Sequence, residues 1–280
     1  MQIRQIATMA VVTLIFLFAY LPVLKSLVSV WMRKDEYSHG FFIIPVAIYI
    51  VWQNRRKYKE FSPNMEWIGF MLLLSALSLY ILSVFARIAT MASVTLPLTI
   101  AGLVLFIYGP KMLKLTAFPI CFLLLMIPVP DQIYTSMTIH LQLFVSKISV
   151  FIASMTGVPI LREGNLIHLP DRVLEVVQAC SGIRSLISLL TLCLIVGYFG
   201  LKSNALRLIF STIAVPVAVI VNAIRVLVMI LALYYFQIDL TSEAVHAYFG
   251  MVIFAVAFVI VMGAYKGFSK WEKHLTLKSS

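Results

Sequence analysis

The sequence predicts an all-α, polytopic membrane protein, and three observations lead to that fold class. Hydrophobic residues make up 62% of the 280 positions, whereas charged residues make up only 12%. A typical soluble domain is about 25% charged, and a soluble core of this length could not hide so much apolar surface. The apolar residues also form runs of about 20 residues, the length that an α-helix needs to cross a bilayer.

The apolar runs predict eight membrane-spanning helices within a single domain that covers the whole chain, residues 1–280. We expect the spans at residues 6–30, 37–53, 67–86, 91–109, 112–128, 182–200, 205–236 and 245–266. The first run is too long for a signal-peptide core and lacks a small-residue cleavage site, so we expect it to be retained. Pro45 weakens the short second span, and Pro216 predicts a kink or tilt in the run 205–236.

Positive charges beside the apolar runs predict how the chain is oriented. The formal net charge is +11, but Lys and Arg gather in short loops, as topology determinants do, rather than forming a nucleic-acid-binding face. The clusters that we expect in the cytoplasm contain Arg55, Arg56, Lys57 and Lys59; Lys111 and Lys114; Lys202 and Arg207; and Lys266, Lys270 and Lys273. Both termini are therefore predicted to be cytoplasmic.

The run 131–155 fits this orientation only if it does not cross the membrane. It carries polar residues along its whole length, among them Gln142 and Lys147. That composition favours an amphipathic helix that lies at the outer surface or re-enters it. The segment 157–178 follows outside the membrane, where Glu163-Gly164-Asn165 is a turn signal that predicts a short β-hairpin.

Two polar residues, Asn222 and Arg225, lie inside the run 205–236. Ionisable groups within spans are rare and usually face a cavity or a partner. Arg225 is about 16 Å from the end of the span near Phe236, at ~1.5 Å per residue. Asn222 precedes it by three residues, so the amide and the guanidinium share one helix face. A structural hydrogen bond between helices is the alternative to a functional role for this pair.

Cys180, Arg184 and His246 all fall at the predicted outer ends of spans. A helix N-terminus favours the thiolate form of a cysteine, and Arg184, one turn further on, would favour it again. Together with Arg225, these residues suit acyl transfer, in which a thiolate attacks a carbonyl, an imidazole transfers the proton and a guanidinium holds the oxyanion. Inert packing of Cys180 and a structural or solvated His246 are the alternatives.

Motifs of several other classes of membrane protein are missing from the sequence. There is no His-Glu-x-x-His, no paired Cys-x-x-Cys, no phosphate-binding glycine loop and no Gly-x-Ser-x-Gly elbow. This weighs against metalloproteases, rhomboid-like serine proteases and ATP-driven pumps. We therefore expect neither a metal ion nor a cofactor.

Several stretches of the sequence resemble the exosortases and their archaeal relatives, the archaeosortases. The resemblance extends from about residue 35 to residue 265. Its stretches are Ser38-His39-Gly40 with Pro45 and Trp52, Pro128-Val129-Pro130, Val176-Val177-Gln178-Ala179-Cys180-Ser181-Gly182-Ile183-Arg184-Ser185, Asn222-Ala223-Ile224-Arg225-Val226, and His246. Proteins of this family look like membrane-embedded transpeptidases that use Cys, Arg and His.

The resemblance implies a nucleophile at Cys180 and catalytic roles for Arg225 and His246. It also implies a substrate class, namely secreted proteins with a C-terminal Pro-Glu-Pro motif, a transmembrane helix and a basic tail. Cleavage through a Cys180 thioester would then occur at the periplasmic face of a bacterial inner membrane. The expected partners are these secreted substrates and the membrane lipids. The candidates for substrate binding are Arg184, Asn222 and His39. For Arg184, stabilising the thiolate of Cys180 is an equally weighted alternative role.

Two other functions fit parts of the pattern. A transporter or channel could bind an anion at Arg225 and Asn222, and its flux would depend on Arg225 but not on Cys180. The sequence lacks the matched broken helices in two halves that many transporters show. A non-catalytic membrane partner or assembly scaffold would be unaffected by thiol reagents applied from outside.

Overall fold

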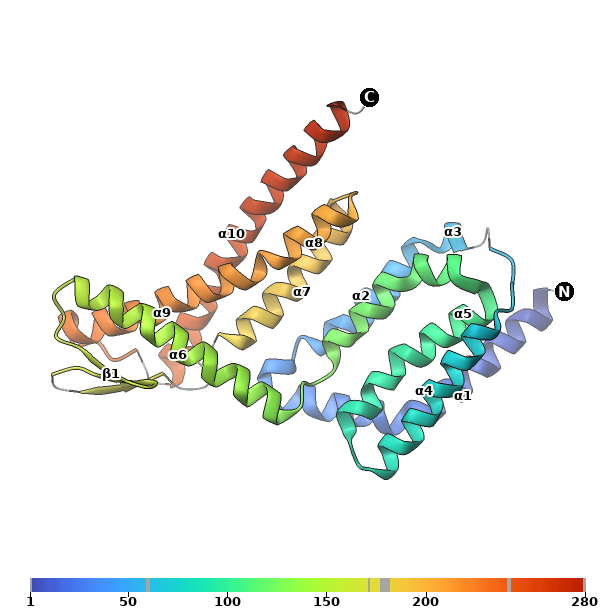
Figure 1. The fold of residues 1–280 in the computed structure, drawn as a ribbon, viewed down its shortest axis with the longest axis horizontal. Helices are drawn as coiled ribbons and strands as arrows, with labels where there is room; N and C mark the ends of the chain where they lie inside the picture. Colours follow the sequence, from blue (N-terminus) through green and yellow to red (C-terminus); the bar gives the residue numbers. More distant parts are fainter. Residues whose placement is uncertain (1, 59–60, 171, 177–181, 241–242, 279–280) are drawn as a thin grey trace. The chain divides into compact units, whose positions relative to one another are not determined.

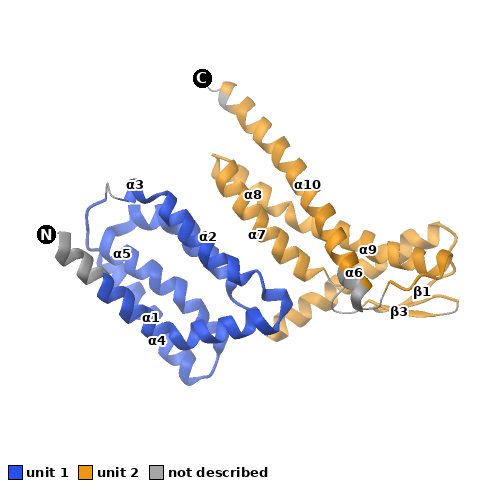
Figure 2. Ribbon diagram, turned by 180° about the vertical axis from the view of Figure 1, so that it is seen from behind, with its two compact units in different colours: residues 1–130 blue, residues 131–280 orange. Residues whose placement is uncertain are grey.

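A computed structural model describes residues 2–58, 61–170, 172–176, 182–240 and 243–278. The described chain is helical apart from one small sheet, which confirms the predicted all-α membrane bundle. It divides into two compact units, unit 1 (residues 1–130) and unit 2 (residues 131–280), which Figure 2 shows in different colours. The single domain that we predicted for the whole chain remains a prediction.

The described residues of unit 1 form three long helices, one of medium length and three short ones (Figure 1). In chain order they are α1 (Gln2–Arg33), η1 (Asp35–Tyr37), α2 (Gly40–Gln53), α3 (Arg55–Tyr58), α4 (Trp67–Phe85), α5 (Ala89–Phe122) and η2 (Leu123–Met126). A kink at Gly109, where φ is +80°, divides α5 into two helices. Pro110 follows the kink, and a proline disfavours helical geometry in the residue before it. The two halves correspond to the predicted spans 91–109 and 112–128.

Helices α4 and α5 cross so closely that glycine is needed at the crossing. A Cβ added to Gly69 of α4 would overlap main-chain atoms of Phe106 in α5. A Cβ added to Gly102 of α5 would lie 2.8 Å from the backbone nitrogen of Leu73 in α4. Small residues let membrane helices approach closely, and van der Waals packing then holds them together.

Replacing Gly69 by Ala is expected to destabilise unit 1, because the new Cβ would meet a backbone that cannot rotate away. Overpacking of this kind costs about 1–3 kcal/mol. Gly263→Ala is the matched control, since a Cβ at Gly263 meets nothing within 4 Å. Thermal unfolding of both variants in detergent measures the difference. Equal unfolding midpoints would contradict the close crossing.

Unit 2 contains the remaining helices and the sheet. Its elements are α6 (Asp131–Met155), β1 (Leu161–Glu163), β2 (Leu166–His168), β3 (Val173–Glu175), α7 (Ile183–Gly200), α8 (Asn204–Thr212), α9 (Ala214–Phe236) and α10 (Glu243–Lys278). The predicted run 205–236 is interrupted between α8 and α9. Pro216 explains the interruption, because its ring clashes with the carbonyl four residues earlier, at Thr212, where α8 ends.

The small sheet has the order β1-β2-β3 and is antiparallel throughout. Leu161 pairs with His168, and a two-residue turn at Gly164 and Asn165 joins the strands. Gly164 has φ +65°, a conformation that glycine adopts readily. The turn confirms the predicted hairpin, and β3 extends it by a third strand.

Helix α10 continues well past the end that we predicted at residue 266. Glu272, which is 8% exposed, accepts hydrogen bonds from the backbone N–H groups of Lys202 (3.0 Å) and Ser203 (2.6 Å). These two N–H groups precede α8, at the helix terminus where backbone donors lack helical partners. The carboxylate therefore ties the late turns of α10 to the start of α8.

Seven helices in the described residues are long and apolar enough to cross a membrane. They are Ala10–Arg33, Trp67–Phe85, Ala89–Met126, Asp131–Met155, Ile183–Gly200, Asn204–Phe236 and Tyr248–Leu275. Helix α2, expected as a span, has 14 residues and is about 21 Å long, shorter than the ~30 Å hydrocarbon core. The two halves of α5 count as one continuous candidate, which removes a second from the eight expected, whereas α6, which was not expected to cross, adds one.

The buried polar residues of α6 contact other elements of unit 2. Gln142 donates to the Val176 carbonyl (2.9 Å), Ser146 to the Gly164 carbonyl (3.2 Å) and Ser149 to the Ala223 carbonyl (3.0 Å). The exposed side of α6 is mixed, because it carries Phe144 and Phe151 together with the polar His140 and Lys147. Gln142, Ser146 and Ser149 therefore serve internal contacts, as polar residues do in membrane-spanning helices. The exposed Lys147 remains consistent with a helix at the membrane surface. That α6 does not cross the membrane remains a prediction.

Candidate active site

Asn222 and Arg225 are buried at the centre of α9. Their side chains are 4% and 7% exposed, respectively. Arg225 is eleven residues from each end of the helix Ala214–Phe236, about 16 Å at ~1.5 Å per residue. This is the depth that the sequence predicts. The pair lies between two apolar clusters of unit 2, one containing Val221 and the other containing Val226.

The start of α7 packs directly against Asn222. Gly182 is the N-cap of α7 and is left-handed, with φ +81° and ψ −2°. A Cβ added to Gly182 would lie 2.9 Å from both the Cγ and the Nδ2 atoms of Asn222. Glycine is therefore needed for two separate reasons, the backbone conformation and the space. The amide of Asn222 is thus next to a backbone position two residues after Cys180.

The guanidinium of Arg225 packs against α10 at Gly250. A Cβ added to Gly250 would lie 3.4 Å from one terminal nitrogen of Arg225 and 3.6 Å from its Cζ atom. Positions 246 and 250 are separated by one turn of α10. Helices α7, α9 and α10 lie side by side (Figure 2), and Asn222 and Arg225 fill the contacts that α9 makes with the other two.

A second set of contacts fixes the chain just before Cys180. Val176 is 1% exposed, its carbonyl accepts the hydrogen bond from Gln142, and its N–H donates to the Asn165 carbonyl (2.9 Å). Val176 and Gly182 are thus both held in place on the two sides of residues 177–181. Sequence reasoning named Gln142 only as a polar residue of the run and missed this role, although its spacing from Thr138 and Ser146 marks one stripe on α6.

Two of the predicted catalytic groups fall outside the described part of the chain. Cys180 lies among residues 177–181, and for His246 the description covers only its backbone in α10. Their roles remain predictions. Arg184 is exposed on the first turn of α7. The left-handed Gly182 interrupts helical geometry between position 180 and Arg184, so the one-turn spacing that we expected between these two positions does not follow.

The remaining candidates are more dispersed. His39 belongs to unit 1, where its Nε2 atom hydrogen-bonds with the Leu125 carbonyl at 3.0 Å, and its expected place on a substrate path remains a prediction. Cys121 and Cys193 carry free thiols, exposed and buried, respectively. In the ranges that the structure describes, no three His, Cys, Asp or Glu side chains gather as a metal site would require.

The fold and these contacts define a polytopic membrane protein with a polar cluster buried between α7, α9 and α10. The model of the family described as Transmembrane exosortase (Exosortase_EpsH) matches residues 31–263, which include all the candidate site residues. The chain belongs to this family of membrane exosortases. Membership implies that it processes secreted proteins that carry sorting signals. Comparisons with curated proteins and with solved structures gave no match.

Replacing Gly182 by Ala is expected to impair processing far more than replacing Gly164 by Ala. Both substitutions put a Cβ on a left-handed residue, but only Gly182 faces another side chain, since a Cβ at Gly164 meets nothing within 4 Å. The backbone strain common to both costs about 1 kcal/mol. Cleavage of a sorting-signal reporter and thermal unfolding of each variant measure the two effects. Equal losses would show that the Asn222 contact is unimportant.

Proposed function

We propose that this chain is a membrane cysteine transpeptidase that uses Cys180, Arg225 and His246. The observation that carries the proposal is the burial of Asn222 and Arg225 between Gly182 and Gly250. Gly182 follows the proposed nucleophile, Cys180, by two residues, and Gly250 follows the proposed base, His246, by four residues. The side chains of one helix face on α9 are therefore close to both chain segments that supply the chemistry.

Covalent geometry supports the same grouping. Two peptide steps separate positions 180 and 182, so their α-carbons are at most about 7.6 Å apart. Gly182 is in contact with Asn222, and Asn222 is one helical turn from Arg225. On α10, the four-residue spacing puts position 246 on the helix face of Gly250, which contacts Arg225.

These residues can carry out acyl transfer in two steps. The Cys180 thiolate attacks the carbonyl carbon of the scissile peptide bond, and the resulting oxyanion accepts hydrogen bonds from Arg225. The tetrahedral intermediate collapses, the C–N bond breaks, and protonated His246 gives its proton to the leaving amine. An amine acceptor or water then attacks the Cys180 thioester, His246 takes the proton, and the thiolate is released.

The substrates in this proposal are secreted proteins with a C-terminal Pro-Glu-Pro motif, a transmembrane helix and a basic tail. Arg184, exposed on the first turn of α7, either binds the glutamate of the motif or tunes the thiol. Asn222 provides an amide for the substrate backbone, and His39 contributes to the substrate path. The clusters of Lys and Arg support cytoplasmic termini and a site that faces the periplasm of a bacterial inner membrane.

The nucleophile is tested by co-expressing a reporter that has a Pro-Glu-Pro tail. Cys180→Ala and His246→Ala are expected to leave the reporter uncleaved, whereas the wild type forms a covalent adduct that mass spectrometry maps to Cys180. Cys193→Ala is the matched control, because Cys193 is fully buried in α7 and has no part in the reaction. Full processing by the Cys180→Ala protein would refute a cysteine mechanism.

Arg225→Lys tests the proposed oxyanion contact. Lysine keeps the positive charge but loses the planar, forked set of donors. Loss of an oxyanion donor lowers kcat by about 10²–10³-fold, while alkylation of Cys180 should proceed at the wild-type rate. Unchanged processing would remove Arg225 from the chemistry. An anion transporter would instead show solute flux that falls in Arg225→Lys and is the same in Cys180→Ala.

A further inference from the structure

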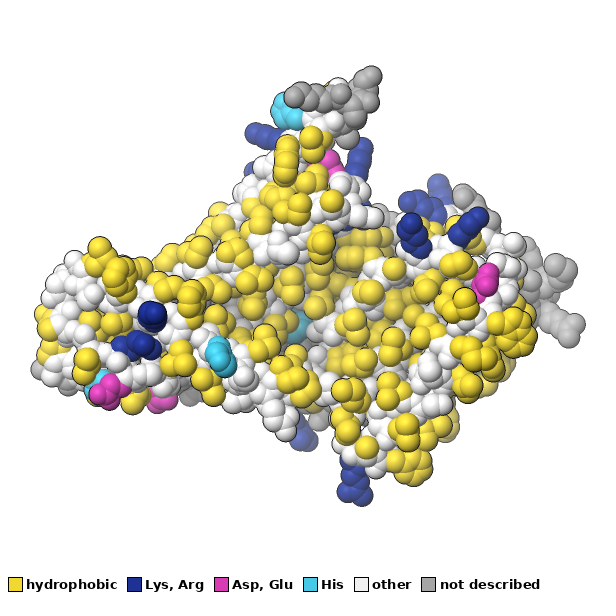
Figure 3. Space-filling model, viewed as in Figure 1, with side chains coloured by type: hydrophobic (Ala, Val, Ile, Leu, Met, Phe, Trp, Pro, Cys, Tyr) yellow, Lys and Arg dark blue, Asp and Glu magenta, His cyan; other side chains and the backbone are white. Residues whose placement is uncertain are grey.

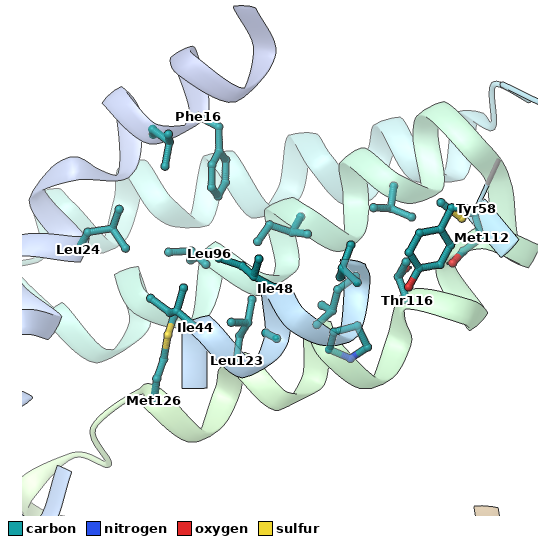
Figure 4. Close-up of a pocket in the computed structure, with 17 residues that line it drawn as sticks. Phe16, Leu24, Ile44, Ile48, Tyr58, Leu96, Met112, Thr116, Leu123 and Met126 are labelled. Carbon is teal, nitrogen blue, oxygen red and sulfur yellow. Dashed lines mark hydrogen bonds between the residues drawn. The ribbon is translucent and has the colours of Figure 1, made fainter. Parts of the chain in front are cut away.

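Unit 1 contains an apolar cavity of about 500 Å³. It lies between α1, α2 and both halves of α5, and Figure 4 shows side chains from these helices pointing into it. Phe16, Leu24, Ile44 and Leu96 are typical of its lining. Thr116 adds a hydroxyl, but this group donates its hydrogen bond to the Met112 carbonyl of its own helix (3.0 Å). The cavity therefore suits a hydrocarbon ligand.

The cavity is open at the side of the unit. Leu17 of α1 and Ile48 and Val51 of α2 line it and are also 47%, 63% and 41% exposed, respectively. In a membrane-spanning unit, an exposed apolar surface faces lipid tails. A hydrocarbon chain can therefore enter between α1 and α2 directly from the bilayer.

One end of the cavity is strongly basic. Tyr58 and Met112 line that end, as Figure 4 shows, and Arg55, Arg56 and Lys57 precede Tyr58 in α3, while Lys111 and Lys114 flank Met112. All five cationic side chains are exposed, and Figure 3 shows Lys and Arg gathered above this end of unit 1. Glu66 is the only acidic residue described here, within 53–58, 61–66 and 107–115, and Asn64 donates a hydrogen bond to it (3.2 Å).

We propose that unit 1 binds one anionic phospholipid, with an acyl chain in the cavity and the headgroup phosphate among these five cations. Basic clusters beside transmembrane helices attract anionic headgroups. The volume fits as well. About 500 Å³ corresponds to roughly 17 water molecules at ~30 Å³ each in the liquid, and a methylene group is of similar size, so one long acyl chain fills the space.

The transmembrane helix of a sorting substrate fits this cavity poorly. A helix is about 10 Å across, so 500 Å³ would hold only about 6 Å of it, or four residues at 1.5 Å each. The basic tail of such a substrate would also be repelled by Arg56, Lys57, Lys111 and Lys114. Charge and volume therefore both favour a lipid over a peptide as the occupant.

Lipid binding to the full-length protein tests this inference. Native mass spectrometry of the detergent-purified chain would compare phosphatidylglycerol with phosphatidylcholine that has the same acyl chains. The expected result is at least about tenfold tighter binding of phosphatidylglycerol, since each nearby cation contributes about fivefold. The same measurement on Cys180→Ala should give the same result. Failure of the lipid proposal can therefore be distinguished from failure of the proposed peptidase activity.

Two sets of variants separate the headgroup from the acyl chain. Converting Arg56, Lys57, Lys111 and Lys114 together to Gln should abolish the preference for phosphatidylglycerol. Arg55 is kept because its guanidinium stacks on Trp52, 4.1 Å from the ring centroid. The matched control converts Lys202, Lys266, Lys270 and Lys273 of unit 2 to Gln, which removes the same charge and should leave the preference intact.

Ala47→Phe tests the acyl-chain site, because it puts a ring into the cavity. This variant should bind both lipids about tenfold or more weakly.

Three outcomes would overturn the proposal. Equal affinity for the two lipids would show that the basic end does not select a headgroup. Displacement of phosphatidylglycerol by inorganic phosphate at equal concentration would show that the cavity contributes nothing. Displacement of the lipid by a sorting-signal peptide would make the cavity a substrate site, if it occurs equally in the wild type and in the variant that lacks Arg56, Lys57, Lys111 and Lys114.

Discussion

Burial of the Arg225 guanidinium in the middle of a membrane-spanning helix is the constraint on which unit 2 depends. Arginine at such a depth costs about 2.5–3.5 kcal/mol on insertion scales, and a side chain ~16 Å from either helix end cannot easily reach water. Neighbouring helices must therefore come close enough to exclude lipid from it. Gly182 and Gly250 allow that approach, because each presents bare backbone to α9.

Several buried polar groups of unit 2 follow the same rule, since they meet backbone groups of other elements. Gln142 of α6 holds the Val176 carbonyl, and Glu272 of α10 holds the N–H groups before α8. Each contact satisfies a backbone group that has no helical partner, which matters most where water is scarce. These contacts also matter for the proposed function, because they hold Val176 and Gly182 in place on either side of the proposed nucleophile.

Features that depend on local chemistry could be predicted from the sequence. Pro216 removes a donor and clashes with the carbonyl of Thr212, and the break before α9 follows from that alone. The turn at Gly164 and Asn165 likewise depends on the backbone freedom of those two residues. Arg225 could be recognised as a candidate because its charge conflicts with the apolar run around it, whatever its neighbours are.

Features that depend on a distant partner could not be predicted in this way. An amphipathic stripe such as that of α6 gives the period of the helix but not the medium on each side, so a polar face turned toward protein and one turned toward water have the same sequence pattern. The length of α10 depends on backbone groups at Lys202 and Ser203, about 70 residues earlier in the chain. Gly250 carries no signal of its own, since glycine is common in membrane helices. It is significant only because Arg225 of another helix packs against it.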